Sequence, residues 1–211
     1  MRFRFAVIAL SASIVAVIPS VAAAQDAIAA LQQQSTAMYT KYIGTLVVLI
    51  ESAGTLDSAR GIKDDAAARM KLVQDLKAAA TKIDLKLLES GSKRASADAE
   101  GYTSVQADTS SKLSGQAGKL FLSGLTQYMV GVRETAGLAA EAPSLLTAVT
   151  AASAGNKLKL LKVKDEMNAA KEMGKGIPEL AKSHGAAIGG IKNYVAKQGL
   201  KIDQSTFTIG K

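Results

Sequence analysis

The sequence predicts an all-α protein, an up-and-down bundle of four to six amphipathic helices followed by a short extended C-terminal tail. Three observations support this prediction. Apolar residues recur every three to four positions over long segments, alanine is abundant, and aromatic residues make up only 4% of the chain, with no tryptophan. Such a composition favours helices and disfavours a β-sandwich. Each helix then carries one apolar stripe, and several stripes bury against one another.

Residues 1–24 have the pattern of a secretory signal peptide. Arg2 and Arg4 precede the apolar run AVIALSASIVAVIP, and Ala22 and Ala24 fit the A-x-A pattern that signal peptidase accepts. The apolar run is too short for a membrane anchor. We therefore expect cleavage after Ala24 and localisation in the periplasm of a bacterium or outside the cell. The chain has no cysteine, so neither a disulfide nor a lipid-modified cysteine is expected.

Residues 25–199 form the expected helical-bundle domain. The first helix is expected over residues 26–52, with this apolar face: Ile28, Leu31, Ser35, Met38, Tyr42, Thr45 and Leu49. The stretch GTLDSARG, residues 54–61, predicts a turn because it combines glycine, aspartate and serine. The second helix is expected over residues 63–88, with these residues facing inward: Met70, Val73, Ala80, Ile83 and Leu87.

Two segments lack a helical apolar stripe. Residues 90–111 are expected to form a polar connection or a helical extension anchored by Tyr102 and Val105, and their alanines favour partial helix. Residues 200–211 have no helical period, although they contain several large apolar residues. We expect this C-terminal tail to lie extended over the bundle.

Prolines divide the second half of the domain. A third helix is expected over residues 113–140. Pro143 and Pro178 are each expected to begin a new helix, because the first helical turn does not need the N–H that proline lacks. The segment 160–177 has helical spacing as well. The last helix, ending near Gly199, carries this apolar face: Leu180, His184, Ala187, Ile188, Ile191 and Val195.

The last helix also holds the only histidine of the chain. Ala181, Gly185 and Gly189 recur every four residues, a spacing that predicts a close crossing with another helix. His184 lies beside this small-residue track. It is predicted to be a packed neutral imidazole, hydrogen-bonded to a carbonyl or hydroxyl group on a facing helix. The alternative is an axial ligand of non-covalent haem, with Met38 of the first helix as its partner.

The residue types leave few routes to catalysis. Without cysteine there is no thiol nucleophile or covalent haem, and a single histidine excludes the paired Glu-x-x-His motifs of di-iron bundles and disfavours zinc. The adjacent acidic residues at 64–65 and 165–166 point about 100° apart on a helix and do not converge on one proton. Neither a cofactor nor an enzymatic activity is expected.

The charge balance bears on the partners. The net charge of +8 is well mixed in sign and is compatible with an anionic envelope surface or an acidic protein partner. An exported chain with few aromatic residues is not expected to bind nucleic acid, and the part after residue 24 has no apolar run of membrane-spanning length. We expect an exported, non-enzymatic binding or interaction module of the envelope. The alternative is a carrier of an apolar ligand, lipid-like or haem, in the bundle interior.

Overall fold

The computed structural model describes residues 21–63, 65–103, 105, 112–153 and 161–209, and it confirms the all-α class. Residues 1–20 of the expected signal peptide lie outside the described part, and α1 already begins at Val21. The helices of the structure are α1 (Val21–Ala59), α2 (Ala66–Ala78), α3 (Leu85–Thr103), α4 (Gly115–Ser153), α6 (Lys164–Gln198) and the short 3-10 helices η2 (Leu161–Val163) and η3 (Gln204–Phe207).

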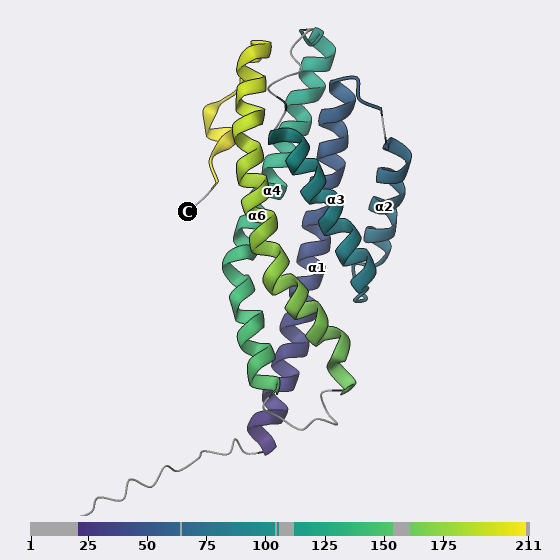
Figure 1. Ribbon diagram of the computed structural model, residues 1–211, viewed down its shortest axis with the longest axis vertical. Helices are drawn as coiled ribbons and strands as arrows, with labels where there is room; N and C mark the ends of the chain where they lie inside the picture. Colours follow the sequence, from purple (N-terminus) through teal and green to yellow (C-terminus); the bar gives the residue numbers. More distant parts are fainter. Residues whose placement is uncertain (1–20, 64, 104, 106–111, 154–160, 210–211) are drawn as a thin grey trace, which may run out of the picture.

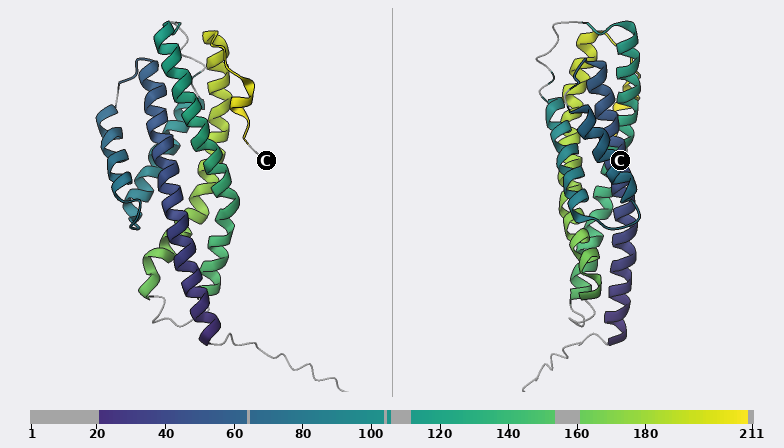
Figure 2. Two further views of the ribbon diagram at one scale, coloured as in Figure 1. Left: turned by 180° about the vertical axis from the view of Figure 1, so that it is seen from behind. Right: turned by 90° about the vertical axis from the view of Figure 1, so that its right-hand side faces the viewer.

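The helices form an elongated up-and-down bundle (Figure 1). Helices α1, α3, α4 and α6 pack side by side, whereas α2 lies on the outside against α1 and α3 (Figure 2). Helix α1 packs against α2, α3, α4 and α6. Helices α3 and α6 are neighbours that run in the same direction (Figure 1). In the part of the chain described here, no helix combines the length and the hydropathy needed to cross a bilayer.

Helix α1 is longer than predicted. The turn expected over residues 54–61 is confined to the end of that segment, because the helix continues to Ala59 and the chain turns at Gly61, whose φ is 79°. Leu56 is fully buried and Ala59 is nearly so, which explains why packing extends the helix beyond the turn-forming residues. At Gly54 the missing side chain makes room for Arg69, whose Cδ would lie 2.8 Å from an added Cβ.

The single helix expected over residues 63–88 is in fact two helices, α2 and α3, separated by a break at residues 79–84. Asp84 starts α3, because its carboxylate accepts the backbone N–H groups of Lys86 and Leu87 at 3.0 Å each, as a helix N-cap does. Within α2, Val73 is buried as predicted, but the prediction for Met70 is wrong. Arg69 is buried, whereas Met70 is 63% exposed.

The polar segment after residue 90 is helical, which confirms the helical-extension alternative as far as Thr103. Residues 106–111 lie outside the described part. Both expected anchors, Tyr102 and Val105, are buried. The rest of the buried face of α3 consists largely of small residues: Gly91, Ala95 and Ala99. Small side chains bring helix axes close together, so α3 packs tightly without the apolar stripe that sequence analysis looks for.

Neither Pro143 nor Pro178 begins a helix, so both of these predictions are wrong. Helix α4 runs through Pro143 and α6 runs through Pro178. A proline inside a helix removes one backbone hydrogen bond and pushes on the preceding turn. Both prolines are exposed, and α6 changes direction along its length (Figure 1). Tertiary packing offsets the cost, because apolar residues on both sides of the prolines are buried: Ala142 and Leu145 in α4, and Ile177 and Leu180 in α6.

The small-residue track predicted on the last helix does not make the close helix crossing. Gly185 and Gly189 are exposed, and a Cβ added to either would meet nothing within 4 Å; Ala181 is half-buried. The close approach occurs instead at Gly190, where an added Cβ would collide with the backbone carbonyl of Tyr102 in α3. Gly190 lies on the face that also carries the large apolar side chains, and apolar burial decides which face turns inward.

The C-terminal tail lies against the bundle as predicted, but it is not wholly extended. Gly199 ends α6 in the left-handed conformation, with a φ of 68°, and η3 interrupts the tail shortly afterwards. Phe207 is buried. The Arg133 guanidinium of α4 donates to the carbonyl oxygens of Thr206 and Thr208, at 2.6 and 2.9 Å. Phe207 and Arg133 therefore hold the tail to the bundle together with Leu200, Ile202 and Ile209, which pack against the core.

Candidate functional site

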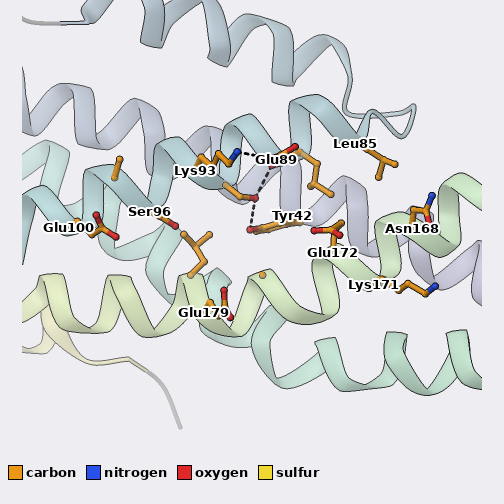
Figure 3. A pocket seen from close by; sticks show the side chains of 15 residues that line it. Tyr42, Leu85, Glu89, Lys93, Ser96, Glu100, Asn168, Lys171, Glu172 and Glu179 are labelled. Atoms are coloured by element: carbon orange, nitrogen blue, oxygen red, sulfur yellow. Dashed lines mark hydrogen bonds and ion pairs between the residues drawn. The ribbon is translucent and has the colours of Figure 1, made fainter.

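A groove of about 780 Å³ runs between α3 and α6, with α1 at its floor (Figure 3). Backbone contact between the two helices at Gly190 and Tyr102 lies beyond one end of the groove. The residues that line it are Tyr42 from α1, Leu85, Leu88, Glu89, Ser92, Lys93, Ser96, Ala97 and Glu100 from α3, and Asn168, Lys171, Glu172, Gly176, Glu179 and Leu180 from α6.

The groove exists because the residues that face each other across it are short. On α3 they include Ser92, Ser96 and Ala97, and on α6 they include Gly176, where an added Cβ would meet nothing within 4 Å. Short side chains at the contact of two parallel helices leave a gap between the helices unless the helix axes come closer to each other. Helix α1 lies beneath both helices and keeps them apart, because it packs against each of them.

Tyr42 forms the buried part of the floor. Its side chain is 1% exposed, and its hydroxyl oxygen lies 3.0 Å from the Ser92 Oγ. Burial raises the pKa of Tyr42 to about 12, with the Ser92 hydrogen bond opposing the rise. The phenol is therefore neutral at any physiological pH. Its polar end meets the groove at the centre of the lining residues (Figure 3).

The walls of the groove carry more negative than positive charge. Glu89 and Lys93 form an ion pair within α3, with Oε1 and Nζ 2.6 Å apart. The other carboxylates of the lining, Glu100, Glu172 and Glu179, form no ion pair with any residue that the structure describes. Four glutamates thus face two lysines, in a chain whose net charge is +8. A concave surface with an excess of one sign of charge attracts the opposite sign.

His184 lies outside the groove lining, in the bundle interior. It is completely buried in α6, and its Nδ1 lies 2.6 Å from the Tyr128 hydroxyl of α4. The Tyr128 ring packs edge-on against Tyr102, with ring centroids 5.5 Å apart. This is the hydrogen bond to a hydroxyl group on a facing helix that the sequence predicted. Burial lowers the pKa of His184 to about 4, so the imidazole is neutral at pH 7.

The proposed haem ligands are not brought together. Met38 is buried in α1. Farther along α1, Leu49 packs on Gly131 of α4. Tyr128, the hydrogen-bond partner of His184, precedes Gly131 in α4 and lies about one helical turn farther still from Met38. Leu49 is already about 16 Å from Met38 along the helix axis. Two axial ligands of one iron must approach it from opposite sides within a few ångströms. His184 and Met38 therefore do not form an axial pair.

A second polar cluster lies under α2. Arg69, 7% exposed, donates to the carboxylates of Asp98 and Asp57, at 2.8 and 2.9 Å, and to the Ile50 carbonyl oxygen at 3.2 Å. Arg94 also pairs with Asp98, at 3.1 Å. Burial raises the pKa of Asp98 to about 6, although the two arginines beside it oppose the rise. The Arg69 cluster ties α2 to α1 and α3.

We expect the buried His184 to make the protein less stable in acid. Its folded-state pKa of about 4 lies below the ordinary pKa of 6.5 that histidine has in an unfolded chain. The folded protein therefore favours the neutral ring, and this stabilisation is present above pH 6.5 and is lost as the pH falls through 4. The loss amounts to about 3 kcal/mol at most. Urea unfolding of the wild type and of His184→Gln at pH 7 and pH 4.5 measures it.

The control for this comparison is internal, because the carboxylates, Asp98 included, titrate in both proteins. The wild type should lose more stability than His184→Gln between the two pH values. Equal losses in the two proteins would contradict the assignment of a buried neutral imidazole.

Several residues of the groove and of the Arg69 cluster escaped the sequence analysis. Tyr42 was recognised only as a member of an apolar face, and Ser92 lay in a segment without a stripe. Arg69 was missed because arginine is rarely buried, although its spacing to Val73 and Leu76, which are buried, is helical. The one available signal was the run of small residues after residue 90.

No group of three or more acidic or histidine side chains that could hold a metal ion occurs within the described ranges. No protein-family model, curated protein or solved structure matches the chain.

Proposed function

We propose that this chain is an exported, non-catalytic binding module of the bacterial envelope and that the groove between α3 and α6 is the surface that holds its ligand. The observation that carries the proposal is the groove itself. It offers about 780 Å³ between two helices, which is within the usual size range of ligand sites. Side chains from α1, α3 and α6 converge on it.

The character of the lining favours a polar ligand over the lipid-like or haem alternative. Most residues of the groove wall are polar or charged. The bundle interior, by contrast, is occupied by large buried side chains, among them Tyr39, Phe121 and Tyr128. These features support a site between the helices at the surface.

The non-catalytic part of the proposal rests on where the reactive groups lie. The only histidine is buried away from the groove. The pKa of the Tyr42 hydroxyl is raised to about 12, so the group stays protonated and supplies no phenolate to act as a base or nucleophile. The groove therefore offers hydrogen bonds and charge to a ligand, and no group among its residues is activated for chemistry.

Filling the groove should abolish ligand binding. Gly176→Trp places an indole in the open space beside the groove wall, whereas Gly185→Trp adds the same side chain to the same helix at an exposed position outside the lining. We expect native mass spectrometry of protein isolated from its own compartment to show a bound small molecule in the wild type and in Gly185→Trp. Gly176→Trp should lack it. Equal occupancy in both variants would refute the groove as the site.

Export is tested by the mature N-terminus. Protein recovered from the envelope or medium of the producing cell should begin at Gln25, as the A-x-A pattern before it predicts. Intact-mass measurement gives this directly. A full-length mass, with residues 1–24 retained, would contradict export by cleavage.

A further inference from the structure

We propose that the groove selects a linear aliphatic amine, whose ammonium groups are bound by the Tyr42 oxygen and by the groove carboxylates. This inference rests on the proposed function and names the class of its ligand. Its first support is the direction of the hydrogen bonds at the floor, and its second is the charge and shape of the walls.

The Tyr42 hydroxyl oxygen, at the floor of the groove, accepts no hydrogen bond from a described residue. Ser92 has a single hydroxyl proton, which it donates to the Leu88 carbonyl oxygen at 2.8 Å. In the 3.0 Å contact between the two hydroxyl groups, Tyr42 must therefore be the donor and Ser92 the acceptor. The lone pairs of the Tyr42 oxygen are then free, and no described residue donates to them. Because this side chain is 1% exposed, a ligand with an N–H group would satisfy an acceptor that is otherwise unpaired.

The walls extend this preference for donors. Glu100, Glu172 and Glu179 add carboxylates that have no cationic partner in the described part of the chain, and they come from both helices (Figure 3). A carboxylate accepts hydrogen bonds and cannot donate them when it is ionised. A ligand that carries positive charge and several N–H donors complements this surface, whereas an anion would meet repulsion along most of it.

The shape of the groove favours a linear ligand with apolar segments. The lining residues extend along the two parallel helices, from Leu85 and Asn168 near one end to Glu100 and Glu179 near the other (Figure 3). Leucine side chains interrupt the polar lining, including Leu88 and Leu180. Methylene segments between ammonium groups can pack on these leucines while the nitrogen atoms meet the oxygen atoms, as lysine stems do on protein surfaces.

Calorimetric titration of the full mature chain with spermidine tests the proposal. Tetramethylammonium chloride at equal ionic strength is the matched control, because it carries positive charge without N–H donors. We expect spermidine to bind with a Kd below about 1 mM and tetramethylammonium not to bind. A tetralysine peptide with blocked ends, titrated in parallel, shows whether free amines or lysine side chains of a partner are the preferred source of the ammonium group.

Four variants locate the interaction, and Glu172→Gln, which removes one groove carboxylate, should weaken spermidine binding. Tyr42→Phe removes the acceptor, and we expect it to weaken spermidine binding by about tenfold or more. Ser92→Ala is a second variant at the same contact, which frees the Tyr42 proton to point into the groove and should also weaken binding. Glu141→Gln makes the same charge change as Glu172→Gln but on α4, outside the groove, and should leave the Kd unchanged. Circular dichroism and thermal melting confirm that each variant is folded.

The outcomes separate this inference from the proposed function. Spermidine binding that Tyr42→Phe and Glu172→Gln weaken, and Glu141→Gln does not, supports amine recognition. Absence of binding to the wild type, or equal weakening by Glu141→Gln, overturns it. If Gly176→Trp still displaces the ligand that co-purifies while spermidine does not bind, the groove remains the site and only the ligand class is wrong.

Discussion

Replacing Arg69 with leucine is expected to lower the free energy of unfolding by about 3–5 kcal/mol, because it removes the guanidinium that two shielded carboxylates share and leaves each of them with a single, weaker cationic partner. The guanidinium lies between the carboxylates of Asp57 and Asp98, and both side chains are largely shielded from water. Without Arg69, Asp57 would keep Arg60 at 3.4 Å and Asp98 would keep Arg94 at 3.1 Å. The Ile50 carbonyl oxygen would lose its contact with the guanidinium as well.

Urea unfolding followed by circular dichroism measures this loss. Lys71→Leu is the matched control on the same helix, because the Lys71 side chain is 75% exposed and its ion pair with Asp75 is a surface pair. Such pairs contribute about 0.2–1 kcal/mol. A similar small effect of both substitutions would contradict the view that Arg69 is the central group of its cluster.

Neutralising the acidic partners of Arg69 is expected to compensate part of the stability that Arg69→Leu loses. Adding Asp57→Asn and Asp98→Asn to Arg69→Leu should restore part of the lost stability, because the buried negative charges are then removed together with the positive one. Non-additive free energies of this kind are expected only for residues that interact directly. A strictly additive, still less stable triple variant would argue against the coupling.

Gly190→Ala is expected to destabilise the protein by at least about 3 kcal/mol, at the upper end of the range for overpacking. The added Cβ would collide with the Tyr102 carbonyl oxygen, a backbone atom that cannot move aside as a flexible side chain does. Relief requires α3 and α6 to separate. That would disturb the Tyr102 hydroxyl, which donates to the Ala53 carbonyl oxygen at 2.9 Å, and the edge-on contact of its ring with Tyr128.

The same helix supplies the control. Gly185→Ala and Gly189→Ala add an identical methyl group in open space, and helix propensity should raise stability by up to about 1 kcal/mol for each. Thermal and urea unfolding of the three single variants should therefore show one large loss and two small gains. A stable Gly190→Ala would mean that α3 and α6 do not touch at this point, and equal losses at all three positions would restore the small-residue track predicted from the sequence.

The sequence alone was sufficient for the fold class and for the faces of the longest helices. The residues expected on the apolar face of α1, from Ile28 to Leu49, are buried, and so is the predicted face of α6 from Leu180 to Val195. Gly199 was correctly expected to end α6. These features are readable because periodicity and helix capping are local, and each is set by residues close together in the chain.

Tertiary structure alone decided the features that depend on distant residues. Pro143 and Pro178 stay within helices because both flanking turns find buried neighbours on other helices. Gly190, and not Gly185, contacts α3. Arg69 is buried because it pairs with Asp57 and Asp98, which are 12 and 29 residues away in the chain. The groove is likewise a gap between two helices that α1 keeps apart. Contacts of this kind depend on the relative positions of whole helices, which the free energy of packing sets and local sequence patterns do not encode.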